Sequence, residues 1–377
     1  MDLHVSLPWE LEEDILSRLP PQSLVRFRAV SKRWNSLFNE KSFINKHMSL
    51  SRPQFIFLTS LFLTKSKIYS IDIIDQRIKL RQLHSSCRDL NLQYGANITT
   101  YDDLLFNKYP FYSKKETVLW NPWSRQVNLI KLSVGKEFNV VSLGYENSGP
   151  QKVHKLLLYY PQTKEVAIYE CASHVEVVIY ECASQALRYI DTPYEVYLAQ
   201  IDRRSHVSLY GVLYWIACNL QTCEYFIQCF DFTSEVFKPF CLLPSQDKSF
   251  LYELRLAVWK GDRFSLLKQC FSSRKIEIWV TKNKIDDVEE EVVWINLMTL
   301  TASNLPELFH KRYGVSYFIY DKTLFMCCSD DEDKHPCIYI VKGDVCNKIQ
   351  IGYGQVSWFS HCAYVPNMTS ATSEFQI

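Results

Sequence analysis

The side chains most able to do chemistry in this sequence are its 13 cysteines and nine histidines. The cysteines run from Cys87 to Cys362 without a C-x-x-C pair, and the adjacent Cys327 and Cys328 do not have the spacing of a zinc site. No two histidines stand at a spacing that would bring both to one metal ion. The odd, scattered set of cysteines argues against a disulfide framework and favours reduced thiols in an intracellular protein.

The sequence motifs of common enzyme sites are absent as well. Neither a G-x-x-x-x-G-K-[ST] loop nor a G-x-G-x-x-G turn occurs among the 10 glycines. There is no G-x-S-x-G elbow and no H-E-x-x-H pair. The acidic run 329–334 (SDDEDK) lacks the alternating ligands and distal glutamate of a calcium loop, so we expect a solvated loop there. We therefore expect no catalytic residue, no cofactor and no metal.

The net charge and the length of the apolar runs argue against nucleic acid and membranes as partners. The chain of 377 residues carries 42 Lys and Arg against 41 Asp and Glu, so no general basic field attracts nucleic acid. The first residues, MDLHVSLPWELEED, lack the apolar core of a signal peptide. The longest apolar run, 55–63, is about half the length that spans a bilayer and is expected to form a buried strand. We expect a protein of the cytoplasm and/or nucleus that is not secreted and binds neither nucleic acid nor membrane.

Residues 6–50 have the three-to-four-residue apolar period of amphipathic helices. In the first segment four apolar residues fall on one face, namely Leu11, Ile15, Leu16 and Leu19. Pro8 suits a first helical turn, and Pro20-Pro21 ends the segment because proline cannot continue a helix. A second short helix is predicted over 22–29, and Ser31 can cap a third.

Beyond residue 55 the period changes to that of strands. Short runs rich in aromatic and β-branched residues recur between turn signals, among them IYSIDI, KLLLYY, VSLYGVLYW and KIEIWV. Similar strand ends recur at roughly the 40–50-residue period of propeller blades. The sequence predicts a mainly β fold with a small α-helical N-terminal module, the β part being a kelch-like propeller of about six blades. A pair of β-sandwiches is the alternative.

One local repeat interrupts this pattern. The hexapeptide IYECAS occurs at 168–173 and again at 179–184, an odd number of residues later. An odd offset turns every side chain to the other face, so the second copy cannot simply extend the strand of the first. We expect one copy to form a blade strand and the other a bulged loop or an extra hairpin strand.

The stretch SLPWELEEDILSRLPPQSLVRFRAVSKRWNSLF resembles the F-box, a three-helix module that docks on the Skp-type adaptor of cullin–RING ubiquitin ligases. Alanine stands at position 29, where these modules often have cysteine, and both side chains are small. A module of this size cannot bury so many apolar side chains by itself, which also predicts an interface. The resemblance implies adaptor contacts by Leu7, Pro8, Leu11, Ile15, Leu16, Leu19, Pro20, Leu24, Phe27, Val30, Lys32 and Trp34.

Basic side chains are interleaved with these apolar ones. The resemblance implies an acidic adaptor, on which they would orient docking: Arg26, Arg28, Lys32 and Arg33. Four such charges without a wider basic field would bind nucleic acid weakly at cellular salt.

The rest of the chain is similar to the F-box-associated interaction domain found behind F-boxes in large plant families. The residues that carry the likeness are Trp120-Asn121-Pro122, Gly144-Tyr145, Ile179-Tyr180-Glu181, Gly211, Tyr214-Trp215, Phe230-Asp231, Leu243-Pro244, Ile278-Trp279 and Tyr364-Val365-Pro366. The duplication is one departure from the family, and Leu187-Arg188, where Trp-Arg is usual, is another. The resemblance implies a β-propeller-like domain for protein–protein interaction.

Together the two resemblances imply an F-box domain at 1–50 and an F-box-associated domain at 51–377. Such a chain would be the non-catalytic substrate-recognition subunit of a Skp–cullin–F-box (SCF) ubiquitin ligase. It would bind the adaptor, through it the cullin and RING subunits, and an unidentified target protein for ubiquitination. Loops at 85–100, 145–155 and 329–336 could carry target specificity.

Two alternatives to the ligase subunit remain open. One is a Skp-bound interaction protein that recruits no ligase. The other, less favoured, is a propeller enzyme or small-ligand receptor, which would need a titratable cluster at the propeller mouth.

Overall fold

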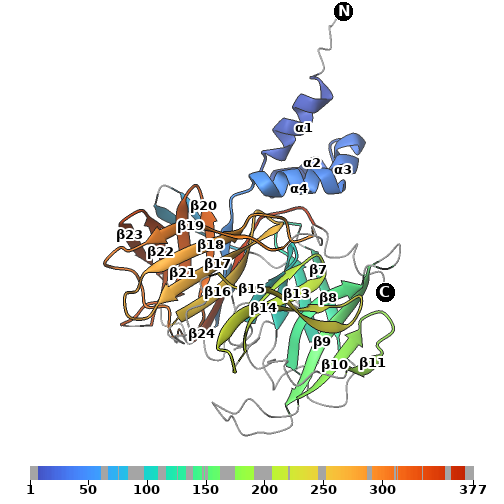
Figure 1. Ribbon diagram of the computed structural model, residues 1–377. Helices are drawn as coiled ribbons and strands as arrows, with labels where there is room; N and C mark the ends of the chain where they lie inside the picture. The colour runs from blue at the N-terminus through green and yellow to red at the C-terminus, as the bar shows by residue number, and fades with distance from the viewer. Residues whose placement is uncertain are drawn as a thin grey trace, which may run out of the picture.

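The computed structural model shows a helical module standing above a ring of β-sheets (Figure 1). The structure describes residues 7–60, 67–74, 76–83, 97–108, 116–124, 126–132, 139–146, 148, 152–161, 175–190, 206–219, 221–244, 252–286, 291–309, 311, 313–332, 334–352 and 358–369. In this part of the chain no helix is long and apolar enough to cross a membrane.

The N-terminal module consists of α1 (Trp9–Ser17), α2 (Pro21–Phe27), α3 (Lys32–Leu37) and α4 (Lys41–Leu50). The second helix was predicted over 22–29, but α2 begins one residue earlier, with Pro21 as its first residue, and ends at Phe27. The predicted cap by Ser31 is confirmed, since its Oγ accepts a hydrogen bond from the Trp34 backbone N–H at 3.4 Å. Beyond the three predicted helices the structure has a fourth, α4. It forms because Phe43 and His47, four residues apart, both turn into the interior of the module.

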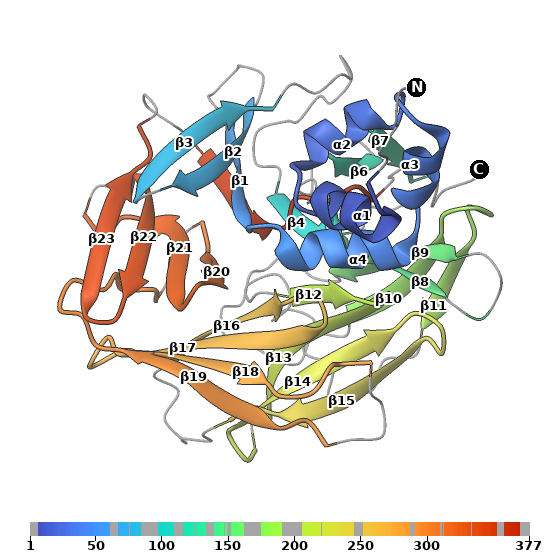
Figure 2. The same ribbon diagram turned by 90° about the horizontal axis from the view of Figure 1, so that it is seen from above.

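Six four-stranded antiparallel sheets are arranged as blades around a central axis (Figure 2). Blade 1 contains β24 (Trp358–Tyr364), β1 (Gln54–Ser60), β2 (Lys67–Ile74) and β3 (Arg77–Gln82). Blade 2 contains β4 (Asn97–Tyr101), β5 (Leu104–Lys108), β6 (Glu116–Asn121) and β7 (Gln126–Lys131), and blade 3 contains β8 (Asn139–Glu146), β9 (Val153–Pro161), β10 (Val175–Glu181) and β11 (Leu187–Ile190). In each case the first-named strand lies next to the axis.

The other three blades follow the same order. Blade 4 contains β12 (His206–Leu209), β13 (Val212–Asn219), β14 (Glu224–Asp231) and β15 (Val236–Leu242). Blade 5 contains β16 (Tyr252–Trp259), β17 (Arg263–Cys270), β18 (Ile276–Thr281) and β19 (Trp294–Leu300). Blade 6 contains β20 (Ser316–Tyr320), β21 (Thr323–Ser329), β22 (Pro336–Lys342) and β23 (Val345–Gln350).

β24, the last strand that the structure describes, closes the ring. β24 pairs with β1 so that Ala363 lies opposite Phe55 and His361 opposite Phe57. Blade 1 therefore combines the first three strands of the propeller with its last one. The backbone hydrogen bonds between β24 and β1 hold the two ends of the propeller together. The predicted six-bladed propeller is confirmed, and the alternative of two sandwiches is wrong.

Two glycines of the family motifs let neighbouring blades approach closely. A Cβ atom built on Gly144 in blade 3 would lie only 2.0 Å from the Phe232 ring of blade 4. Gly211 adopts φ +78°, and its Cβ would lie 2.8 Å from the Tyr145 ring. Glycine is required at both places because the aromatic rings occupy the space of a side chain.

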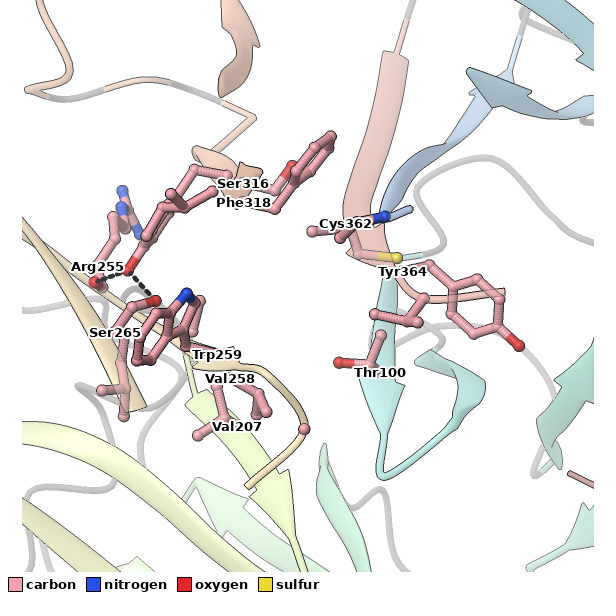
Figure 3. Close-up of a pocket in the computed structure, with 18 of the residues that line it drawn as sticks. Thr100, Val207, Arg255, Val258, Trp259, Ser265, Ser316, Phe318, Cys362 and Tyr364 are labelled. Atoms are coloured by element: carbon pink, nitrogen blue, oxygen red, sulfur yellow. Dashed lines mark hydrogen bonds between the residues drawn. The ribbon is translucent and has the colours of Figure 1, made fainter. Parts of the chain in front are cut away.

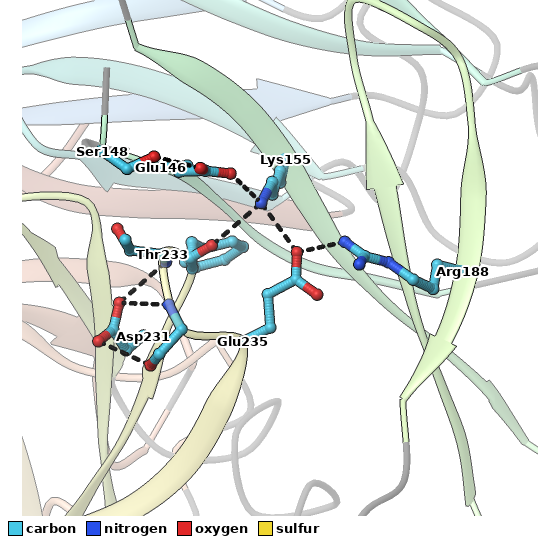
Figure 4. Close-up of polar contacts among 9 residues, drawn as sticks. Glu146, Ser148, Lys155, Arg188, Asp231, Thr233 and Glu235 are labelled. Atoms are coloured by element: carbon cyan, nitrogen blue, oxygen red, sulfur yellow. Dashed lines mark hydrogen bonds and ion pairs between the residues drawn. The ribbon is translucent and has the colours of Figure 1, made fainter.

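Polar contacts also join blades 3 and 4 (Figure 4). The almost fully buried Lys155 ammonium donates to Glu146 Oε2 at 2.6 Å, Glu235 Oε1 at 2.8 Å and the Phe232 carbonyl at 3.3 Å. Arg188 binds the same Glu235 carboxylate. Burial alone would lower the pKa of Lys155, but the hydrogen bonds to the two carboxylates raise it above its ordinary value. The cluster holds the β14–β15 turn against β9.

Several local predictions can be placed. Residues 55–58 of the apolar run are buried in β1, as predicted, whereas 61–63 lie outside the described residues. The second IYECAS copy enters β10, while the first, 168–173, lies outside the described residues. The expected solvated loop at 329–334 is confirmed for Glu332 and Lys334, which are exposed, and is wrong for Ser329, which is buried at the end of β21, and for Asp330. Asp330 is buried and lies 2.6 Å from Lys348 Nζ, because its carboxylate has a cation to neutralise it.

Candidate adaptor surface and propeller channel

An exposed apolar row marks one side of the helical module. Leu7, Leu11 and Ile15 recur every fourth residue before and along α1, and expose 52%, 52% and 49% of their surfaces. Val30, between α2 and α3, is exposed as well. Large apolar side chains repeated at helical spacing and left in water are typical of a surface that another protein covers.

The inner side of the same helices forms a small core. Its six buried hydrophobic residues are Leu16, Leu24, Leu37, Phe38, Phe43 and Met368. Partly buried against them lie Leu19, Phe27 and Trp34, with Trp9 and Val25. The module thus has one apolar face that is packed and one that is open.

Side-chain contacts between α1 and α3 hold α1 in the orientation that leaves Leu7, Leu11 and Ile15 exposed. Trp34 Nε1 donates a hydrogen bond to Glu12 Oε2 at 3.3 Å. The Arg33 guanidinium stacks on Trp9, with 3.4 Å between its Cζ and the ring centroid. Both contacts tie the exposed helix to the packed part of the module.

The basic residues of the module also divide into two groups. Arg28 Nη2 lies 3.5 Å from the Phe38 carbonyl, which it meets inside the module, and burial lowers the pKa of its guanidinium. Arg33 is engaged by Trp9. Arg26 and Lys32 remain exposed, so these two are available for an acidic partner.

A cavity of about 2190 Å³ runs along the propeller axis, and α4 borders it with Asn45 and Met48. The innermost strands form its wall. Figure 3 shows Thr100, Val207, Arg255, Phe318 and Tyr364 arranged around the opening. Because α4 contributes to the lining, the helical module and the mouth of the channel lie on the same side of the propeller.

Polar groups in the channel wall are bonded to each other. The Tyr317 hydroxyl donates to the Arg255 carbonyl at 3.2 Å and lies 3.0 Å from Ser265 Oγ. Ser316 Oγ lies 2.5 Å from His361 Nδ1. Burial, and then the Arg255 charge, lower the pKa of His361 to about 3, so this imidazole is neutral at neutral pH. Within the described ranges, no group of three or more His, Cys, Asp or Glu residues could hold a metal ion.

Comparison with protein families gives the two regions their identities. A model of the F-box domain matches residues 5–46, and a model of the F-box associated beta propeller domain matches residues 59–371. The chain belongs to the F-box proteins with an F-box-associated propeller.

Proteins of Arabidopsis thaliana resemble this F-box protein over nearly its whole length. Protein SUPPRESSOR OF NIM1 1 is 51% identical over 389 residues, which cover 97% of this chain and 98% of the relative. F-box protein At3g17710 is 48% identical over 385 residues, which cover 98% of each chain. Among solved structures, TolB from Acinetobacter baumannii aligns with 82% of this chain and 66% of its own at 10% identity and a TM-score of 0.41, too distant a likeness for an argument about function.

The structure separates the twelve residues that the F-box resemblance implied. Seven are exposed: Leu7, Pro8, Leu11, Ile15, Pro20, Val30 and Lys32. Three are half-buried, Leu19, Phe27 and Trp34, and two are fully packed inside, Leu16 and Leu24. Leu16 and Leu24 cannot fill pockets of a partner without opening the F-box core. We therefore correct their role to packing, whereas adaptor contact by the exposed residues stays a prediction.

The sequence did not indicate that the segment after β24 packs against the F-box. Met368 lies in the F-box core. The neighbouring Asn367 is fully buried, with its Nδ2 donating to the Asp103 carbonyl at 2.6 Å and its Oδ1 accepting from Asn121 Nδ2 at 3.0 Å. Asn121 belongs to one family motif and Asn367 directly follows another. No pattern in the sequence predicts that the two side chains form a hydrogen bond. The segment joins blade 2 to the F-box, so the core of the module extends beyond residues 1–50.

His47 is a second residue that the sequence did not single out. Its Nε2–H donates to the Leu19 carbonyl at 2.9 Å, which ties α4 to the link between α1 and α2. Burial lowers the pKa of His47, and the bond to the carbonyl offsets this only in part. The F-box core therefore contains a neutral imidazole at neutral pH.

Proposed function

We propose that this protein is the substrate-recognition subunit of a Skp–cullin–F-box ubiquitin ligase. The observation that carries the proposal is the exposed row Leu7, Leu11 and Ile15 on a module that matches the F-box domain. These side chains, with Val30, are the apolar anchors of the adaptor contact, and Arg26 and Lys32 add charge beside them. Through the adaptor the chain joins the cullin and RING subunits.

In this proposal the propeller holds the target protein. The channel is bordered by α4 and lined by Tyr210, Trp259 and Tyr320, which lie at the ends of the innermost strands of three blades. Figure 2 shows α4 over the opening of the ring. A target bound at this rim lies on the same side as the F-box. Its lysines are then kept near the ubiquitin carrier, and the raised effective concentration supplies the rate without a catalytic residue in this chain.

A pull-down with purified Skp-type adaptor tests the F-box contact. We expect Leu11→Ala/Ile15→Ala to weaken adaptor binding by about 2–4 kcal/mol, because each removes a half-exposed anchor without opening the core. Leu16 is left unchanged, since its loss would report on folding. Leu50→Ala is the matched control: Leu50 is a similarly exposed leucine at the end of α4, and its removal leaves binding unchanged. Equal binding by the wild type and the double variant would contradict the proposed surface.

Ubiquitin transfer tests the remaining part of the proposal. The complex is reconstituted with the cullin, the RING subunit and the conjugating enzymes, and a protein captured by the propeller is assayed for ubiquitin. Ubiquitylation that needs the intact F-box supports the ligase subunit. Adaptor binding without any transfer to a captured protein would instead support the alternative of a Skp-bound protein outside the ligase.

A further inference from the structure

The outer strand of each blade has an edge with backbone groups that no described strand pairs, and most of these strands carry protection against another strand. A charge or a proline stands in five of the six: Arg77, Lys79 and Arg81 in β3, Lys131 in β7, Arg188 in β11, Lys238 and Pro239 in β15, and Lys348 in β23. Charges and proline at an edge discourage pairing with a further strand. β19, with the sequence WINLMTL, has neither.

The exposed side chains of β19 are uncharged: Ile295 and Leu297 are apolar, and Asn296 and Thr299 are polar and bonded to each other. The strand pairs with β18 from Trp294–Thr281 to Leu300–Ile276, and within the described residues nothing pairs with its other edge. Ile295 and Leu297 expose 45% and 38% of their surfaces. Next to the strand lies Leu242, whose carbonyl accepts a hydrogen bond from Trp294 Nε1 at 3.1 Å and whose side chain is exposed. A strand added here would find apolar side chains along the edge.

We propose that the free edge of β19 pairs with an extended, uncharged apolar segment of a partner protein, which becomes a fifth strand of blade 5. The backbone N–H and C=O groups of an edge repeat at strand spacing, and only another extended backbone matches them. Ile295, Leu297 and Leu242 select apolar side chains, because a charged one would lose its water against them. Figure 2 shows β19 on the side of the ring opposite the F-box helices, so this partner and the adaptor do not compete.

The register of β19 favours a foreign segment over a second copy of this chain. The pairs Trp279–Asn296 and Ile278–Met298 leave Leu297 as an extra residue, a bulge in the middle of the strand. Two copies paired antiparallel about their common midpoint would place bulge against bulge and break the ladder of both. A short foreign strand can pair with either half of β19 alone.

A fluorescein-labelled peptide of alternating threonine and valine, flanked by lysines for solubility, serves as the probe. Its fluorescence anisotropy is measured with the full-length protein, with Ile295→Lys/Leu297→Lys, and with the matched control Val345→Lys. Val345 is an apolar residue of the outer strand β23 and is 59% exposed. Thermal unfolding confirms that each variant is folded. We expect the wild type and the control to bind the peptide and the β19 variant to lose at least about tenfold in affinity.

Two further measurements distinguish strand pairing from other contacts. A peptide of the same sequence with N-methyl groups on alternate residues keeps the side chains but cannot complete the ladder, so its binding should be lost. Equal binding of this peptide, or equal binding of the original peptide to the β19 variant, would overturn the proposal. Light scattering over a range of concentrations tests for self-association. A dimer of the wild type that Ile295→Lys/Leu297→Lys abolishes would show a second copy as the occupant instead. The inference does not depend on the adaptor or on ligase activity.

Discussion

The F-box core contains six buried hydrophobic residues, and one of them, Met368, comes from the segment after β24. The propeller instead packs large side chains between neighbouring blades all around the ring and closes the ring with β24 against β1. The difference teaches how each region can be used. The propeller packs its own core, so only its rim and strand edges are available to partners. The F-box has one exposed apolar face, and its packed face includes Met368 from a distant part of the chain.

The sharpest way to test this difference is to make the same cavity in each region. Leu24 and Leu158 are both fully buried leucines, one in the F-box and one in blade 3. We expect Leu24→Ala to cost about 3–5 kcal/mol in the free energy of unfolding of the helices, because the small core cannot collapse around the hole. Leu158→Ala should cost a similar amount, but in the unfolding of the propeller.

Circular dichroism follows the helices. Tryptophan fluorescence follows the propeller separately when all proteins carry Trp9→Phe and Trp34→Phe, because these two tryptophans lie in the F-box. In Leu24→Ala the helical signal should disappear at a temperature at which the propeller remains folded. If both variants instead unfold in one common transition, the two regions form a single cooperative unit and the comparison fails.

Removal of the distant core residue should have a smaller effect. Met368→Ala is expected to lower the free energy of unfolding of the helical module by about 2–3 kcal/mol, since a buried thioether is lost from a core of six. Met298→Ala, a partly buried methionine of β19, is the control and should leave the helical transition unchanged. A helical transition that Met368→Ala does not shift would mean that the F-box core is complete within residues 1–50.

Local signals in the sequence account for what could be predicted. Proline at 8, 20 and 21 and serine at 31 act through their own backbone geometry, so the helix starts could be placed from residue types alone. The alternating aromatic and β-branched runs predicted strands for the same reason. The blade period then followed from their recurrence.

The features that the sequence did not predict depend on contacts between residues far apart in the chain. Leu11 and Leu16 are both leucines of α1, and the packing of the other helices and Met368 decides that Leu16 is inside and Leu11 outside. The bond between Asn121 and Asn367 joins two blade ends that no spacing connects. That β19 is an outer strand without a charge or a proline became visible only when strand order showed which strands are outermost.

The smallest expected change in stability comes from His47. It should make the stability of the helices depend on pH independently of the propeller. Its pKa in the folded protein lies below the ordinary value of 6.5, because burial opposes the charge more than the Leu19 carbonyl favours it. The unfolded chain therefore binds the proton more readily, so stability of the helices is full above pH 6.5 and falls as the pH drops below it. His47→Gln keeps a donor for Leu19 without a titrating ring, and should flatten the pH dependence of the helical transition. The propeller transition, followed by tryptophan fluorescence in the same Trp9→Phe/Trp34→Phe background, should keep its own pH dependence in this variant. An unchanged pH dependence of the helices in His47→Gln would assign their acid sensitivity to other groups.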